Sequence, residues 1–189
     1  MNYKLIMTEG TTELYFLNIL FERGLLRFGK DELFFQRFYP SRQIDGSLVQ
    51  KIQSLNRNDD VTVIRVGDKL NDLFQKPKNV KNKIKEVINV ETAPEFEILF
   101  VINENLYREY EKKKNKTKEK PSQFFKKRHP EYHKNKDFIE RYLESMSDKE
   151  IIDMIDGYSR LKPVSVKNTI KCLLRQELLK DRGLKGEIF

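Results

Sequence analysis

Two acidic residues follow directly after short apolar stretches, which is where an α/β protein places its chemistry. Glu9 comes after Tyr3–Thr8 and Asp68 comes after Val61–Val66, and a glycine stands beside each of the two acidic residues. Functional side chains of open α/β sheets gather where strands end and helices begin. Carboxylates from adjacent strands can share a hard cation such as Mg²⁺, which can position a phosphodiester and stabilise charge at the leaving oxygen. These positions therefore predict an acidic, metal-binding site at one edge of a sheet.

A second pair of acidic residues, Glu13 and Asp72, lies a few positions further along the chain in the same two regions. Acidic side chains at helix N-termini stabilise the helix dipole and need no metal, and we favour this interpretation for Glu13 and Asp72. For Glu9 and Asp68 the dipole interpretation and the metal-binding interpretation both stay open, because each residue directly follows an apolar strand.

The segment Leu5–Phe16, which reads LIMTEGTTELYF, resembles the opening of TOPRIM-type domains. It is most similar to the nuclease-like branch of overcoming-lysogenization-defect and RloB-like proteins, in which a strand, Glu-Gly, Thr-Glu and an aromatic residue recur. Val63–Asp68 resembles the strand before the second acidic motif of the family, and Pro94–Leu99 is similar to a Phe-Glu stretch of the RloB-like branch. The resemblance covers the N-terminal half of the chain.

The resemblance implies a Rossmann-like sheet, a divalent metal (Mg²⁺ or Mn²⁺), and cleavage or rejoining of phosphodiesters in DNA or RNA. In the family the glutamate after the first strand acts as acid or base, which matches Glu9, and the aspartates of an Asp-x-Asp motif hold metal. Asp68 matches the first aspartate, but the second falls on Leu70, which cannot bind Mg²⁺. Asp72 or Glu97 would then complete the metal site.

The chain is basic, with a net charge of +8, which favours polyanionic partners: nucleic acid first and acidic membranes second. The cations concentrate between Lys112 and Arg128, a stretch that also contains the adjacent Phe124 and Phe125. Cations contact phosphates without reading sequence, and exposed aromatic rings can stack on unpaired bases. The alternative is a solvated helix face with both phenylalanines in the core. The candidate nucleic-acid-binding residues are Lys69, Lys112, Lys113, Lys114, Lys126, Lys127 and Arg128.

Strands alternate with helices early in the chain and helices alone follow, which predicts an α/β fold. We expect a small, mostly parallel, Rossmann-like (TOPRIM-like) sheet with flanking helices and a helical C-terminal extension. In a single domain, the α/β sheet core would span 1–105, a basic arm 106–136 and the helical part 137–189. The expected strands are 3–8, 33–39 and 61–66, and the expected helices are 11–27, 47–55, 138–145, 147–158 and 169–180. The stretch 80–90 is typical of a lysine-rich helix or of a helix leading into a short strand, and Ser147 and Glu150 predict a capping box.

One cysteine, Cys172, cannot form an internal disulfide, and no apolar segment approaches the roughly 20 residues of a membrane span. We therefore expect no signal peptide, no membrane association and a reducing cytoplasm. The sequence leads to a metal-dependent, nuclease-like protein, which the resemblance associates with mobile elements or defence systems. The alternative is a non-catalytic module that binds nucleic acid or protein with a degenerate metal site, and a third hypothesis is an interaction protein acting through its helical C-terminal region.

Overall fold

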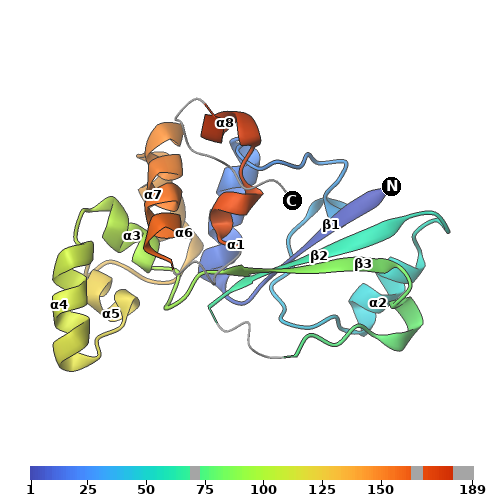
Figure 1. The fold of residues 1–189 in the computed structure, drawn as a ribbon, viewed down its shortest axis with the longest axis horizontal. Helices are drawn as coiled ribbons and strands as arrows, with labels where there is room; N and C mark the ends of the chain where they lie inside the picture. The colour runs from blue at the N-terminus through green and yellow to red at the C-terminus, as the bar shows by residue number, and fades with distance from the viewer. Residues whose placement is uncertain (69–72, 163–167, 181–189) are drawn as a thin grey trace.

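Three strands form a parallel sheet at the N-terminal side of the molecule. In the computed structural model, β1 (Asn2–Thr8), β2 (Asp60–Gly67) and β3 (Ile84–Glu91) lie in the order β1-β2-β3, and both strand pairs are parallel (Figure 1). The structure describes residues 1–68, 73–162 and 168–180. The predicted α/β class with a small parallel sheet and flanking helices is confirmed.

Successive residues of β1 and β2 enter two different hydrophobic clusters, as the two-residue period of a strand requires. Leu5 and Val63 lie in the cluster that includes α2 (Gly46–Gln53), whereas the adjacent Ile6 and Ile64 lie in the larger cluster. β2 is the central strand and is buried at nearly every position, which accounts for its dense run of β-branched residues. Both faces of the sheet are therefore covered.

The larger cluster packs one face of the sheet against the remaining helices. α1 (Thr11–Glu22) follows β1 directly, and α6 (Lys136–Glu144) lies against α1. α7 (Asp148–Leu161) lies against α3 (Ile98–Asn103). Figure 1 shows α4 and α5 beyond the carboxyl ends of the strands. The helices of this half are α3 (Ile98–Asn103), α4 (Tyr107–Thr117), α5 (Pro121–Lys126), α6 (Lys136–Glu144), α7 (Asp148–Leu161) and α8 (Gln176–Lys180).

The best-predicted helix is α7, because its start is encoded locally. The hydroxyl of Ser147 accepts a hydrogen bond from the amide of Glu150 at 3.3 Å, and the carboxylate of Glu150 accepts one from the amide of Ser147 at 2.7 Å. These two bonds form the predicted capping box. In the part of the chain that the structure describes, no helix is long and apolar enough to cross a membrane.

The predicted strand over 33–39 is wrong. The segment holds a short 3₁₀ helix, η1 (Phe34–Gln36), and reaches β1 only through isolated bridges near its two ends. Phe35 and Gln36 adopt positive φ angles of 47° and 54°, which interrupt an extended chain. The aromatic residues that suggest a strand here are used instead to pack a turn against β1.

Several helix boundaries also differ from the expected ones. Of the two alternatives for 80–90, the lysine-rich helix is wrong, and the structure is closer to a helix that leads into a strand. A 3₁₀ helix, η2 (Lys78–Val80), precedes β3, which pairs with β2 despite its lysines. The expected helix 169–180 divides into η3 (Ile170–Leu173) and α8, since Leu174 between them forms an antiparallel bridge to Leu26. α1 ends at Glu22, ahead of the predicted end, because Gly24 takes a φ of 67°.

Candidate functional site

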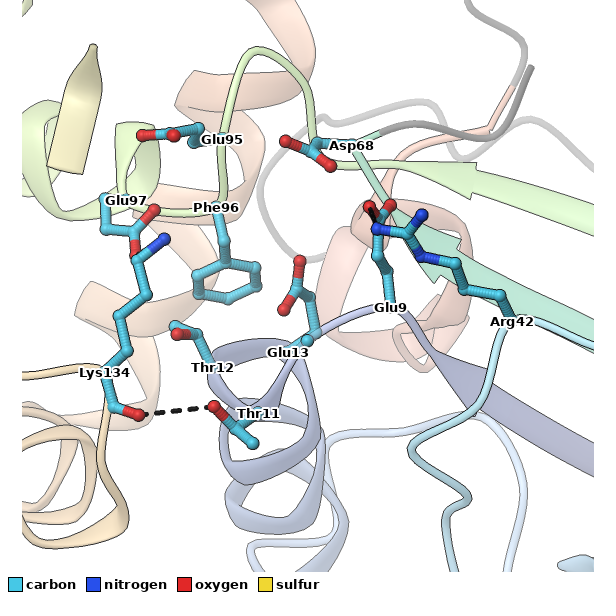
Figure 2. Close-up of a pocket in the computed structure, with 11 residues that line it drawn as sticks. Glu9, Thr11, Thr12, Glu13, Arg42, Asp68, Glu95, Phe96, Glu97 and Lys134 are labelled. Atoms are coloured by element: carbon cyan, nitrogen blue, oxygen red, sulfur yellow. Dashed lines mark hydrogen bonds and ion pairs between the residues drawn. The ribbon is translucent and has the colours of Figure 1, made fainter. Parts of the chain in front are cut away.

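A pocket of about 260 Å³ opens at the carboxyl edge of the sheet, between the start of α1 and the segment before α3 (Figure 2). Charged side chains from several distant parts of the chain line it. The five carboxylates belong to Glu9, Glu13, Asp68, Glu95 and Glu97, and the two cations to Arg42 and Lys134. The fold therefore gathers an excess of acidic groups at the position where open α/β sheets carry their function.

The two strand-end carboxylates lie where the sequence predicts. Because β1 and β2 are paired and parallel, Glu9 and Asp68 leave the same edge of the sheet from neighbouring strands. The amide of Glu9 donates to the carbonyl of Val66 at 2.9 Å, which extends the strand pairing to the pocket. A Cβ on Gly67 would lie 2.6 Å from the Cβ of Glu9 and 2.5 Å from its Oε2. The glycine beside Asp68 therefore leaves room for the Glu9 side chain.

Glu13 belongs to this pocket, although the sequence favoured a helix-dipole role for it. It lies in the first turn of α1, yet its side chain is buried. Burial and the neighbouring carboxylates raise the pKa of Glu13 to about 7, and those neighbours are Glu97, Asp68 and Glu9. A carboxyl group that only stabilised the dipole would stay solvated and keep an ordinary or lowered pKa. The sequence signal that could have placed Glu13 in the pocket is its spacing from Glu9. A turn from strand to helix lies between the two residues and brings their side chains close together.

Glu97 lies immediately before α3 and is completely buried, with 0% of the residue exposed. Its Oε1 accepts hydrogen bonds from the hydroxyl of Tyr132 and pairs with Nζ of Lys134 at 3.0 Å. Its Oε2 is buried and has no hydrogen-bond partner within 1–68, 73–162 and 168–180. A buried carboxylate oxygen without a donor costs free energy, and a cation in the pocket would remove that cost.

Glu95 faces the pocket from the same segment, but the start of α5 engages both of its oxygens. Oε2 accepts a hydrogen bond from the amide of Ser122 at 3.1 Å, and Oε1 lies 3.7 Å from Nζ of Lys120. Burial acts to raise the pKa of Glu95, but the hydrogen bonds from Ser122 and the nearby lysines leave it below its ordinary value. Glu95 therefore connects α5 to the rim of the pocket.

Two cations that the sequence did not single out complete the pocket. Arg42 comes from the loop before α2 and pairs with Glu9, and Lys134 comes from the loop before α6 and pairs with Glu97. The side chains of Arg42 and Lys134 are 54% and 53% exposed, whereas those of Glu9 and Glu97 are 9% and 1% exposed. Both cations therefore approach the buried carboxylates from solvent.

The donor set of the pocket fits a divalent cation. All of the candidate ligands are carboxylate oxygens, which Mg²⁺ and Mn²⁺ prefer. Among the residues that the structure describes, no three histidine, cysteine or acidic side chains already lie close enough together to hold an ion. Mg²⁺ is usually bound through one or two carboxylates and keeps several waters, so a preformed cage is not required. In Figure 2 the side chains of Glu9, Glu13 and Asp68 lie on the same side of Phe96, so an ion held by Asp68 and Glu13 would lie near Glu9.

Three residues considered in the sequence lie outside the described residues: Lys69, Leu70 and Asp72. The structure therefore places Asp68 and Glu97 of the predicted metal ligands in one pocket with Glu9, and leaves Asp72 unplaced.

The basic stretch is folded as the α4–α5 unit (residues 107–128), and its candidate cations do not line the pocket. Lys112, Lys113 and Lys114 lie on α4, Lys126 ends α5, and Lys127 and Arg128 follow it. Phe124 and Phe125 are both 0% exposed, so the hypothesis that they stack on bases is wrong and the core interpretation is confirmed. Their apolar surface packs against other aromatic rings, including those of Tyr110 and Phe100.

Comparison with protein-family models, with curated proteins and with solved structures finds no match for this chain. The arguments that follow therefore use the geometry of the pocket and the motifs of the sequence.

Proposed function

We propose that this protein is a metal-dependent nuclease of the TOPRIM kind, which cleaves phosphodiesters of DNA or RNA in the cytoplasm, in a mobile element or a defence system. The observation that carries the proposal is the convergence of Glu9, Glu13 and Asp68 in one pocket at the carboxyl edge of a parallel sheet. The motif resemblance around Glu9 and Asp68 supports the same assignment.

In this proposal the chain's own residues divide the work between ion binding and proton transfer. Asp68 and Glu13 bind Mg²⁺ or Mn²⁺, and the buried Oε2 of Glu97 offers further negative charge beside them. The ion, once bound, stabilises charge at the leaving oxygen. Glu9 takes or gives the proton, because its carboxylate follows the carboxyl end of β1 and lines the same pocket as Asp68 and Glu13. General acid–base groups of this kind typically contribute about 10²–10⁴ in rate.

A second candidate is a non-catalytic module that binds nucleic acid or a protein. It is favoured by the ion pairs of Arg42 with Glu9 and of Lys134 with Glu97, which already neutralise two of the carboxylates. Leu70 stands where the family carries its second aspartate, which also points to a weakened metal site. In this case the pocket is a structural remnant and binding occurs elsewhere on the basic surface.

A cleavage assay separates the two candidates. Wild type and Glu9→Gln are incubated with single-stranded and duplex DNA and RNA, with Mg²⁺ or Mn²⁺ and with chelator. Gln keeps the size of Glu but cannot carry the charge or exchange the proton, so we expect cleavage to fall by about 100-fold or more. Glu22→Gln is the matched control, because Glu22 is an exposed residue at the end of α1 and lies outside the pocket. Both circular dichroism spectra should match that of wild type.

Two results would overturn the nuclease assignment. Cleavage that persists in chelator, or that Glu9→Gln supports as well as wild type, contradicts this mechanism. Absence of cleavage by wild type on every substrate favours the binding module.

A further inference from the structure

The two cations of the pocket, Arg42 and Lys134, share the same kind of environment. Each is about half exposed, each comes from a loop that precedes a helix, and each pairs with a carboxylate that is almost completely buried. Because the carboxylates of Glu9 and Glu97 are buried, each would be left as a costly unpaired charge if its cation simply moved away. Arg42 and Lys134 can therefore leave Glu9 and Glu97 when another cation in the pocket takes over the compensation of the acidic charge.

Hydrogen bonds tie the loops that carry these cations to other parts of the chain, which keeps the cations near the pocket when they change partners. Next to Arg42, the side chain of Gln43 donates to the carbonyl of Leu73 and accepts from the amide of Gln75, both at 3.3 Å. On the other side, the hydroxyl of Thr11 donates to the carbonyl of Lys134 at 3.2 Å. The side chains can move while their attachment points are held.

The start of α1 adds a third positive element. Gly10, Thr11 and Thr12 line the pocket at the N-terminus of this helix, where the first amides lack intrahelical partners and the helix dipole is positive. Anions bind readily at such positions. The pocket is thus lined by carboxylates, by two basic side chains and by the N-terminus of α1.

Resting on the proposed metal site, we propose that Arg42 and Lys134 are the phosphate-binding residues of this pocket and that they exchange their carboxylate partners for a phosphodiester when the metal enters. A metal held by Asp68 and Glu13 would compensate the acidic charge of the pocket, and the released cations would turn to the non-bridging oxygens of the phosphate. Arg binds phosphate through a planar fork of donors, whereas Lys acts as a point charge. Both residues are positioning residues for the substrate.

This exchange makes metal and phosphodiester bind cooperatively. Without the metal, the excess of carboxylates repels an anion. Without the anion, the metal has to displace two cations that remain nearby and repel it. Because coupling between two ligands is reciprocal, the anion must strengthen metal binding by the same factor by which the metal strengthens anion binding.

The test is calorimetric titration of Mn²⁺ into the full chain, with dimethyl phosphate as the smallest phosphodiester anion and trimethyl phosphate as its neutral control. We expect dimethyl phosphate to raise the affinity for Mn²⁺ by about 5-fold or more, and trimethyl phosphate to leave it unchanged. Arg42→Gln and Lys134→Gln should each tighten Mn²⁺ binding in the absence of anion by about 2- to 5-fold, because they remove a competing cation. The same variants should lose most of the enhancement by dimethyl phosphate.

Two control variants keep the result specific. Arg37→Gln removes an exposed arginine that lies over the ring of Tyr39, and Lys136→Gln removes an exposed lysine that pairs with Glu140 on α6. Both should behave as wild type in every titration.

The outcomes separate this inference from the proposed function. If wild type binds no Mn²⁺ with or without dimethyl phosphate, the metal site itself is contradicted and the inference falls with it. If wild type binds Mn²⁺ but dimethyl phosphate has no effect, or if Arg42→Gln weakens Mn²⁺ binding and keeps the enhancement, only the exchange is overturned.

Discussion

The acidic pocket and the basic α4–α5 unit distribute their charges in opposite ways. In the α4–α5 unit some of the cations have acidic partners within the unit: Glu109 pairs with Lys113 and Arg128, and Glu119 pairs with Lys127. In the pocket, carboxylates from separate segments meet and outnumber the two cations there. The α4–α5 unit keeps an excess of ten lysines and arginines over three glutamates, and most of these cations are exposed to water. The pocket keeps an acidic excess of five carboxylates over two cations, and its carboxylates are largely buried.

This difference shows which charges in a sequence carry chemistry. Exposed charge is solvated by water and needs no ligand, and the α4–α5 unit buries Phe124 and Phe125 beneath its lysines. Buried charge is costly to the fold, as the raised pKa of Glu13 illustrates. The buried Oε2 of Glu97, which has no hydrogen-bond partner among the described residues, illustrates the same cost. The predictions below test each side of the comparison.

The largest expected effect lies in the α4–α5 unit. Phe125 is 0% exposed and its ring lies against those of Phe100, Tyr132 and Tyr142. Phe125→Ala should lower the free energy of unfolding by about 3–5 kcal/mol, as measured by urea denaturation. The exposed neighbour Lys126 provides the control, and Lys126→Ala should change stability by less than about 0.5 kcal/mol. A Phe125→Ala protein of wild-type stability that no longer binds nucleic acid would contradict the core role of this ring.

The next prediction concerns the cost of ionising the buried Glu13, which makes stability depend on pH. The folded pKa of Glu13 is about 7, against an ordinary value of 4.5, so between these values the folded state binds more protons than the unfolded state. Stability contributed by protonated Glu13 is therefore complete below the lower value, falls as pH rises through the window, and is lost above the higher value.

Glu13→Gln removes this titration and keeps the size of the side chain. Above pH 7 the variant should be more stable than wild type by about 3 kcal/mol, and below pH 4.5 the difference should disappear. Urea denaturation across the pH range measures it, with Glu22→Gln as control. A stability difference that does not depend on pH would show that Glu13 carries no strained charge.

A smaller effect is expected at the glycine that makes room for Glu9. Gly67→Ala places a Cβ 2.6 Å from the Cβ of Glu9, so the Glu9 side chain must move. We expect a loss of about 1–3 kcal/mol in stability, together with weaker Mn²⁺ binding. Gly46→Ala is the matched control, because a Cβ there meets nothing within 4 Å and alanine favours the helix α2. Equal stability and equal Mn²⁺ affinity of the two variants would contradict the close packing of Glu9 against β2.

The smallest effect concerns nucleic-acid binding by the α4–α5 unit. Lys112 and Lys114 are exposed on α4, whereas Lys113 pairs with Glu109 at 3.2 Å. Each lost phosphate contact should reduce the slope of log affinity against log salt concentration by about 0.7–0.9. Lys112→Gln with Lys114→Gln should therefore change the slope more than Lys113→Gln does. A slope that is unchanged in the double variant would remove this face from the binding surface, and a protein that does not bind at low salt would remove nucleic acid as a partner.

The sequence predicts those parts of the molecule whose signals are local. The β-branched residues of β2 predict a strand, and the capping box predicts the start of α7. The positions of Glu9 and Asp68 after apolar strands predict that both lie at the carboxyl edge of the sheet. The strand over 33–39 fails because composition does not reveal the positive φ angles within it.

The pocket residues that the sequence leaves unmarked depend on long-range packing. Arg42 and Lys134 lie in loops without a motif and reach the pocket only because α2 and α6 pack where they do. Glu13 has the same local pattern as an ordinary first-turn acid, and only its burial against the other carboxylates distinguishes it. Convergence of this kind is a property of the tertiary structure.

The central claim is that the acidic pocket holds a divalent cation. Anomalous diffraction from crystals of the full chain soaked in Mn²⁺ tests it most directly, because the signal locates the ion without reference to activity. The account predicts a peak within the pocket, at about 2 Å from oxygens of Asp68 and at least one of Glu9 and Glu13. A well-occupied Mn²⁺ elsewhere on the protein, with no peak among these carboxylates, would contradict it.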